Sequence, residues 1–204
     1  MLTFVLITAA AYLLGSVPSS VWLGKWLRGT DLREHGSGNA GATNAFRVLG
    51  KPIGMAVLLA DMTKGALAVM LSNFQEIIPE ETDGWMALRI GLGIAAVTGH
   101  VFPVFAGFRG GKGVATLSGI GLAIHPFSAL TAMAIYLGVF LITRISALAS
   151  LTAVISYPLW VILVFRTEYL SLKVFSVLVL LLVLVTHRKN IARLVRGQEG
   201  SLFR

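Results

Sequence analysis

The feature that most constrains this chain is a series of long apolar segments that follow one another almost from end to end. A hydrocarbon core of ~30 Å requires roughly 20 apolar residues per helix. Such segments lie near residues 2–24, 53–73, 85–105, 127–143, 147–165 and 171–186, and a shorter one lies near 114–125. Only 13% of the 204 residues are charged, whereas a soluble domain has ~25%. We therefore predict an all-α integral membrane protein, a bundle of about seven transmembrane helices forming one domain over residues 1–204. A re-entrant element around His125-Pro126 is the alternative to two separate spans there.

The charges in the loops predict the orientation of this bundle. The loop 74–84 holds only acidic charges, whereas 25–51, 106–113 and the tail after residue 186 are strongly basic. Cytoplasmic loops carry the excess of Lys and Arg, so we expect the N-terminus outside and the C-terminus inside. The net charge of +8 is then explained by topology, and nucleic-acid binding is not indicated. No basic residue precedes Lys25, so we read the first segment as a retained span and not as a signal peptide.

Two glycine-rich stretches lie on the predicted cytoplasmic face, GSGNAGATN at 36–44 and GHVFPVFAGFRGGKGVAT at 99–116. Glycines allow neighbouring backbone N–H groups to converge, and nearby cations make such a concavity suitable for a phosphate. A basic loop that only fixes topology is the alternative. The candidate binding residues are Gly36, Ser37, Gly38, Asn39, Thr43, Asn44, Arg47, Gly110, Gly111, Lys112 and Gly113.

Neither stretch fits a nucleotide-binding motif. GSGNAG matches the spacing G-x-G-x-x-G, but that fingerprint needs a preceding strand and a βαβ unit, and the flanks here are membrane segments. GGKG is similar to a Walker A motif, but Gly113 stands where Ser or Thr should follow the lysine. The chain has no cysteine, and its four histidines show no ligand spacing, so we expect no metal and no cofactor.

Further candidates follow the last spans. His187, Asn190 and Arg193 are spaced by three residues and share one helical face. The alternative for His187 is an amphipathic side chain at the membrane interface with no catalytic role. Ser146 and Ser150 are one turn apart and can donate to a ligand or serve helix packing. Asp61 and Lys64 lie within the second span at i, i+3 and can pair. An isolated charge within the membrane costs ~2.5–3.5 kcal/mol. We therefore expect the pair either to stabilise the packing of the helices or to support a site, and both alternatives stay open.

GSGNAGATN, GHVFPVFAGFRGGKGVAT and HRKNIARL, together with DMTKG in the second span, resemble the bacterial membrane glycerol-3-phosphate acyltransferases that use acyl phosphate, the PlsY family. The resemblance covers essentially the whole chain. It implies transfer of an acyl chain from acyl phosphate to the 1-hydroxyl of glycerol 3-phosphate, which gives lysophosphatidate and phosphate. It also implies a location in the bacterial inner membrane with the active site facing the cytoplasm. Functional coupling to the soluble enzyme that makes acyl phosphate stays open.

The residues fit this reaction. Both substrates carry a phosphate, which explains two cationic glycine-rich loops, and the apolar donor suits a site at the end of a helix bundle. We expect Ser37, Lys112 and His187 to be catalytic, and the other candidates to bind substrate. The base is either His187 or a substrate phosphate oxygen. The competing function is a transporter or channel for a phosphate ester, but it predicts charged residues along several spans.

Overall fold

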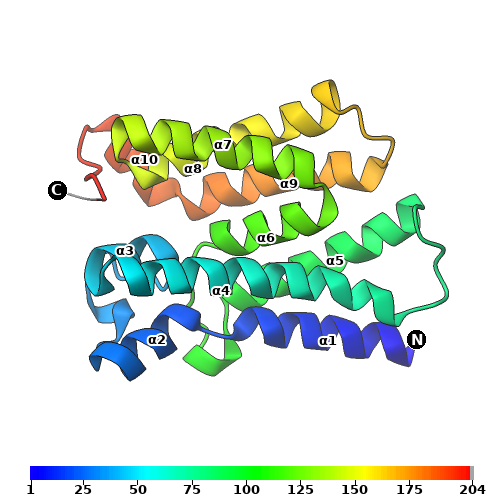
Figure 1. The fold of residues 1–204 in the computed structure, drawn as a ribbon, viewed down its shortest axis with the longest axis horizontal. Coiled ribbons are helices and arrows are strands. Elements are labelled where there is room, and N and C mark those ends of the chain that lie inside the picture. The colour runs from blue at the N-terminus through cyan, green and yellow to red at the C-terminus, as the bar shows by residue number, and fades with distance from the viewer. Residues whose placement is uncertain (203–204) are drawn as a thin grey trace. The chain divides into compact units, whose positions relative to one another are not determined.

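The computed structural model describes residues 1–202, and these form helices and connecting loops with no strand among them. The chain divides into two compact units, Met1–Ile124 and His125–Arg204, which are described separately. Figure 1 shows the succession of helices from the N-terminus to the C-terminus. The prediction of an all-α protein is confirmed for the described part of the chain.

In the first unit, three long helical segments pack through small residues. α1 (Leu2–Ser16) lies against α5 (Asp83–Val101) and α4 (Lys51–Met70), and α4 also packs on α6 (Val114–Ile124). A side chain at Gly15 would collide with the Ala96 backbone, and one at Gly119 with the Met62 backbone. Such close backbone approach is typical of helices packed in membranes. The shorter elements are α2 (Ser19–Arg28), η1 (Leu32–Glu34), α3 (Ala42–Leu49), η2 (Leu71–Phe74) and η3 (Val104–Ala106).

The first predicted span, 2–24, is interrupted at Val17-Pro18. Pro18 has no N–H to continue the helix, and Val17 before it is extended, with φ −60° and ψ 111°, as the residue before a proline prefers. α2 continues to Arg28 and carries Trp22 and Trp26, whose rings stack with centroids 5.5 Å apart. Tryptophan at a helix end is typical of the membrane–water interface.

The second unit contains α7 (Pro126–Thr143), α8 (Ser146–Leu159), the π-helix η4 (Trp160–Val164), α9 (Leu170–Thr186) and α10 (Arg188–Val195). α8 packs against α7 and α9. The π-helix follows Pro158, whose missing N–H disturbs the regular ladder of hydrogen bonds. α9 and α10 meet at His187 with a bend of 66°.

The described helices agree with a membrane protein. Five are long and apolar enough to cross a bilayer, and the bent pair α9 and α10 would be the sixth. α6 has 11 residues and is therefore ~16 Å long, which is too short to cross ~30 Å of hydrocarbon. The expected count of about seven spans and their orientation stay predictions.

Candidate active site

The first glycine-rich loop is shaped by one buried amide. Asn44 is 1% exposed, and its Oδ1 accepts a hydrogen bond from the backbone N–H of Ser37 at 2.9 Å. Its Nδ2 donates to the carbonyl oxygens of Leu32 at 3.1 Å and His35 at 3.0 Å. Gly36 has φ +62°, and a side chain there would collide with this amide. Asn44 thus holds the loop so that Ser37 is exposed.

The second glycine-rich loop is anchored to the end of α5. The N–H of Gly110 donates to the carbonyl oxygen of Val101 at 3.2 Å, and the N–H of Gly111 donates to that of His100 at 3.1 Å. We expected these N–H groups to meet a phosphate, but the structure uses them to fix the loop.

Each loop leads directly into a helix. α6 begins at Val114, immediately after Lys112 and Gly113, and α3 begins at Ala42 with Gly41 as its N-cap. The first N–H groups of a helix lack intrahelical partners, and the helix dipole adds partial positive charge there. An anion is favoured at such a position. α3 was not expected from the sequence, and it places Thr43 in its first turn and Arg47 in its last.

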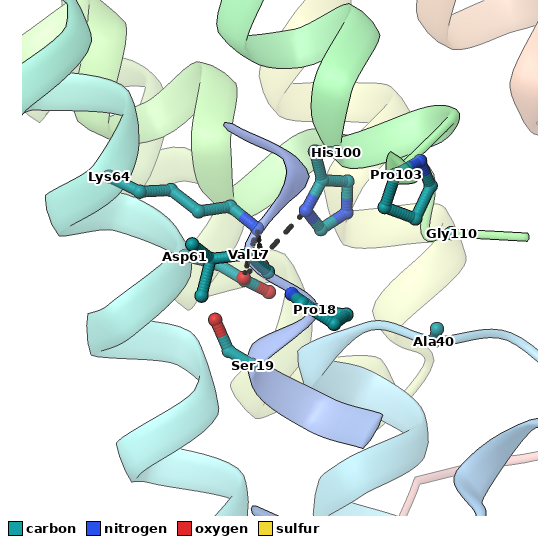
Figure 2. A pocket seen from close by; sticks show the side chains of 9 residues that line it. All are labelled: Val17, Pro18, Ser19, Ala40, Asp61, Lys64, His100, Pro103 and Gly110. Carbon is teal, nitrogen blue, oxygen red and sulfur yellow. Dashed lines mark hydrogen bonds and ion pairs between the residues drawn. The ribbon is translucent and has the colours of Figure 1, made fainter. Parts of the chain in front are cut away.

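A buried charged cluster lies beneath both loops (Figure 2). The carboxylate of Asp61 on α4 is 2.9 Å from Lys64 Nζ and 3.7 Å from His100 Nδ1 on α5. The expected Asp61–Lys64 pair therefore forms, and His100 joins it. A side chain at Gly111 would collide with the His100 ring and would lie 3.0 Å from the carbonyl oxygen of Ala40. The structure thus brings the two loops together over His100.

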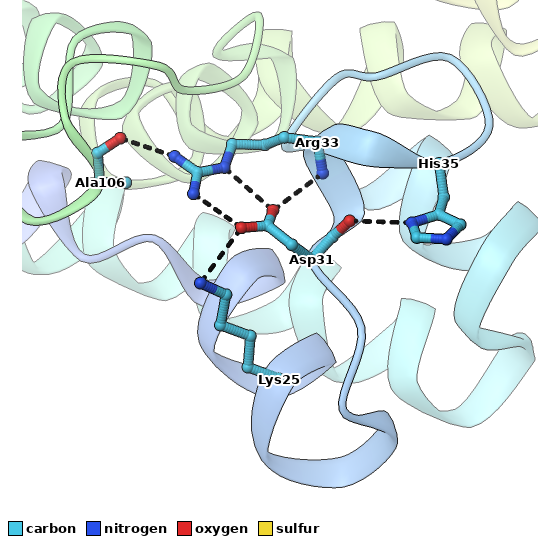
Figure 3. Close-up of polar contacts among 5 residues, drawn as sticks. All are labelled: Lys25, Asp31, Arg33, His35 and Ala106. Carbon is cyan, nitrogen blue, oxygen red and sulfur yellow. Dashed lines mark hydrogen bonds and ion pairs between the residues drawn. The ribbon is translucent and has the colours of Figure 1, made fainter.

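A second ionic cluster links the segments that lead into the loops (Figure 3). Asp31 accepts from Arg33 Nη2 at 2.7 Å and pairs with Lys25 at 3.2 Å, while Arg33 Nη1 donates to the carbonyl oxygen of Ala106 at 2.7 Å. The hydrogen bond from Arg33 holds the pKa of the Asp31 carboxyl well below its usual range, and Asp31 in turn raises the pKa of Arg33. We read the two basic residues only as topology signals and did not consider Asp31. An acidic residue between Lys25 and Arg33 was the available signal.

In the second unit the expected residues lie on α8 and on or next to α10. Ser146 is the first residue of α8, and its Oγ is 3.0 Å from the hydroxyl of Tyr136 on α7. Ser150 lies one turn further along α8 and is buried. α10, which carries Asn190 and Arg193, packs against α8 and α9.

His187 stands at the bend between α9 and α10 and is 3% exposed. Its Nδ1 is 3.1 Å from the carbonyl oxygen of Val183. A carbonyl only accepts, so Nδ1 carries the hydrogen in this contact, and Nε2 is the acceptor when the ring is neutral. A backbone carbonyl thus orients the ring of the residue that we expected to be catalytic.

A carboxylate that we did not consider joins the remaining two candidates. Glu199 accepts from Asn190 Nδ2 at 2.6 Å through one oxygen and from Arg193 Nε at 2.5 Å through the other. The tail is also tied down by a hydrogen bond from the Leu202 N–H to the Arg144 carbonyl oxygen at 2.8 Å. Glu199 is the one acidic residue after Glu168, which was the available signal.

The structure thus groups the candidates within each unit. Ser37 and Arg47 are exposed, whereas Asn39, Thr43, Gly111 and Lys112 are partly buried, in or beside the joined loops. Among residues 1–202, no three His, Asp or Glu side chains are placed to hold a metal ion. The class that emerges is an integral membrane protein with cationic, glycine-rich loops at helix N-termini.

The chain belongs to the glycerol-3-phosphate acyltransferase family, because the family model of that description matches residues 5–197. It is 40% identical to a glycerol-3-phosphate acyltransferase of Chlorobium limicola, with 99% of this chain and 97% of the relative covered. It is 41% identical to the enzyme of the same description from Chlorobaculum tepidum, with the same coverage. The resemblance seen in the motifs is confirmed.

Two solved structures of PlsY, an integral membrane glycerol 3-phosphate acyltransferase, are similar over nearly the whole chain. The glycerol 3-phosphate form has a TM-score of 0.83 and 37% identity, and it covers 98% of this chain and 99% of its own. The lysophosphatidic acid form has a TM-score of 0.82 and 38% identity, with 97% and 94% covered. The chain is therefore a membrane acyltransferase of the PlsY family.

Proposed function

We propose that the protein transfers an acyl chain from acyl phosphate to the 1-hydroxyl of sn-glycerol 3-phosphate. The products are 1-acylglycerol 3-phosphate and inorganic phosphate, and the reaction is an early step of phospholipid synthesis at the cytoplasmic face of the bacterial inner membrane. Membership of the family supports the acyl transfer, and the forms in which PlsY was solved support the acceptor and the product. The choice of acyl phosphate as the donor is argued from the residues of this chain.

The observation that supports acyl phosphate as the donor is the pair of glycine-rich loops in the first unit. Each loop leads into a helix N-terminus; Lys112 lies directly before α6, whereas Arg47 lies in the last turn of α3. A phosphate on both substrates accounts for two such loops. A thioester donor would not place a phosphate next to the reacting carbonyl, and one loop would then lack a function.

The phosphate contacts follow from this arrangement. Lys112 and the first N–H groups of α6 neutralise one phosphate, as cations and helix starts do for anions. The Ser37 hydroxyl, the Asn39 amide and the first turn of α3 with Thr43 provide donors for the other. Asn44, with both amide hydrogens used by the loop backbone, positions Ser37 instead of contacting substrate.

The reaction needs little covalent help from the protein. The 1-hydroxyl oxygen of glycerol 3-phosphate attacks the acyl carbonyl carbon, a C–O ester bond forms, and the C–O bond to phosphate breaks. The hydroxyl proton passes to a phosphate oxygen of the substrates and leaves with inorganic phosphate, so charge and atoms balance. The protein contributes positioning and stabilisation of the negative charge.

His187 binds the acceptor in this scheme. With Nδ1 held by the Val183 carbonyl, Nε2 accepts a hydrogen bond from a substrate hydroxyl. A carbonyl stabilises an imidazolium less than a carboxylate would, so we assign the proton transfer to a substrate phosphate. Ser146 and Ser150 on α8, and Asn190 and Arg193 on α10, supply further donors for substrate.

The proposal is tested by incubating the purified protein in detergent with glycerol 3-phosphate and palmitoyl phosphate, and measuring lysophosphatidate and inorganic phosphate together. Equal amounts of the two products are expected, with Lys112→Ala strongly reduced in both. No lysophosphatidate, combined with uptake of glycerol 3-phosphate by proteoliposomes that contain the protein, would refute the proposal in favour of a transporter.

For His187, we expect His187→Ala to raise the KM for glycerol 3-phosphate, while kcat falls less than ~10²-fold. A fall in kcat of ~10²–10⁴-fold at unchanged KM would assign the base to His187 instead. Both constants come from the same product assay at saturating palmitoyl phosphate.

A further inference from the structure

The cluster of Asp61, Lys64 and His100 is the most buried set of charged or ionisable groups in the first unit. Asp61 is 1% exposed, and Lys64 and His100 are each 6% exposed. All three lie on helices that we assign to the membrane, where ionisable residues are costly and usually mark a function. The proposed reaction uses none of them.

Lys64 and His100 each contact a part of the chain next to the loops, and Asp61 lies between them. Lys64 Nζ donates to the carbonyl oxygen of Val17 at 2.9 Å, at the break between α1 and α2. The backbone carbonyl of His100 accepts the Gly111 N–H, and the His100 ring fills the space where a Gly111 side chain would be. The Asp61 carboxylate pairs with Lys64 Nζ at 2.9 Å and faces the His100 ring, with Oδ1 3.7 Å from Nδ1.

The cluster and the loops share the wall of one small cavity (Figure 2). Its lining includes Ser19 at the start of α2, Ala40 of the first loop and Gly110 of the second, together with Asp61, Lys64 and His100. These side chains therefore lie next to the backbone of both loops. An ordinary packing pair within the bundle would not have this connection.

We propose that Asp61, Lys64 and His100 are positioning residues that hold the second glycine-rich loop against the first and so set the affinity for a phosphate-bearing substrate. This inference rests on the proposed function, because it assigns phosphate binding to these loops. The cluster does not touch the reacting atoms. It acts through the ring of His100 beneath Gly111 and through the Lys64 contact that fixes the α1–α2 break.

The decisive comparison uses the double variant Asp61→Asn/Lys64→Met. Either single change leaves one buried charge without its partner and lowers the melting temperature. The double change removes both charges at similar volume, so we expect the melting temperature to recover most of the loss. The KM for glycerol 3-phosphate or for palmitoyl phosphate is expected to stay raised, by roughly fivefold or more, while kcat changes less.

A second pair of variants keeps the test decisive if the double variant does not fold. His100→Ala empties the space beneath Gly111 and is expected to raise the same KM, whereas His100→Gln fills it and can bond to Asp61, so it is expected to remain close to the wild type. Arg89→Met is the matched control. Arg89 Nη2 donates to the Ala123 carbonyl from the other end of α5, ~16 Å from His100 along the helix.

The control should lower the melting temperature and leave both KM values within about twofold of the wild type. Wild-type KM values in the double variant, or equal KM values in His100→Ala and His100→Gln, would overturn the inference. The cluster would then serve only the packing of the helices. The melting temperature in the presence of 10 mM glycerol 3-phosphate supplies a readout without turnover. One outcome separates the two proposals: the wild type makes no lysophosphatidate, yet glycerol 3-phosphate raises the melting temperature of the wild type and not that of His100→Ala. In that case the proposed reaction is wrong and the positioning role stands.

Discussion

Replacing Asn44 by alanine tests whether this amide builds the first loop. The change removes three hydrogen bonds, with the Ser37 N–H and with the carbonyl oxygens of Leu32 and His35. A hydrogen bond contributes about 0.5–1.5 kcal/mol net. Since Ser37 and His35 are exposed, water can replace part of the loss, and we expect a destabilisation of roughly 2–3 kcal/mol.

In a chain of this size that loss corresponds to a melting temperature lower by about 5–10 °C. The loop is also expected to lose its shape, so the KM for at least one phosphate-bearing substrate rises roughly fivefold, the equivalent of ~1 kcal/mol of binding. The assays are a thermal melt in detergent and lysophosphatidate formation at varied glycerol 3-phosphate and palmitoyl phosphate, both well below the melting temperature.

Leu49→Ala is the control for stability. Leu49 is on the same helix, is 4% exposed, and packs with Leu32 and Val57 in the apolar core, so its truncation costs about 2–5 kcal/mol. It should lower the melting temperature as much or more and leave both KM values unchanged. Equal KM values for Asn44→Ala and Leu49→Ala would refute the reasoning.

Three further predictions follow from the polar contacts. Asp31→Asn should be less stable than the wild type at pH 7. Because the pKa of Asp31 is lowered in the folded protein, the difference in melting temperature should shrink as the pH falls below the usual Asp pKa of about 3.9. A difference that is independent of pH down to about 3 would contradict this. Glu199→Ala should free Asn190 and Arg193 from their shared partner and lower kcat/KM roughly tenfold, with Glu199→Gln less affected because it can still accept from one of them; equal losses in both would argue against the clamp. Gly111→Ala should abolish most activity because its side chain has no space, as a steady-state assay of the folded variant would show, and a fully active variant would contradict the close approach of the loops.

The membrane character and the family could be predicted because they depend on local sequence. Apolar segments of membrane length are visible without tertiary information, and the motifs around Ser37, Lys112 and His187 identify the family. The break at Val17-Pro18 was also predictable, since a proline in the middle of a span cannot donate to the helix. The predicted span 2–24 includes this break because the apolar segment continues beyond the proline.

The contacts that hold the site were not predictable, because they join residues far apart in the sequence. His100 meets Asp61 across 39 positions, and Arg33 reaches the Ala106 carbonyl across 73. The sequence shows the charges but not their partners. The glycine-rich pattern predicts Gly110 and Gly111 as phosphate donors, whereas their N–H groups bond to carbonyls at the end of α5.

α3 was missed for a different reason. Its eight residues, Ala42–Leu49, are too few for a periodic apolar pattern to stand out, and isolated helices of this length are marginal without packing. Ala45 and Leu49 pack with Ile53 and Val57, which stabilises the helix. In the proposed function, the start of α3 supplies the N–H groups of the anion site at the first loop.

The central claim, that acyl phosphate is the donor, is tested most directly by competition in one reaction. Purified protein receives glycerol 3-phosphate with equal concentrations of palmitoyl phosphate and palmitoyl-CoA that carry different isotopic labels, and the label in early lysophosphatidate gives the ratio of their kcat/KM values. We predict that nearly all of the label comes from palmitoyl phosphate, and that Lys112→Ala lowers this incorporation. Label predominantly from palmitoyl-CoA would contradict the assignment of the second phosphate site and of the donor.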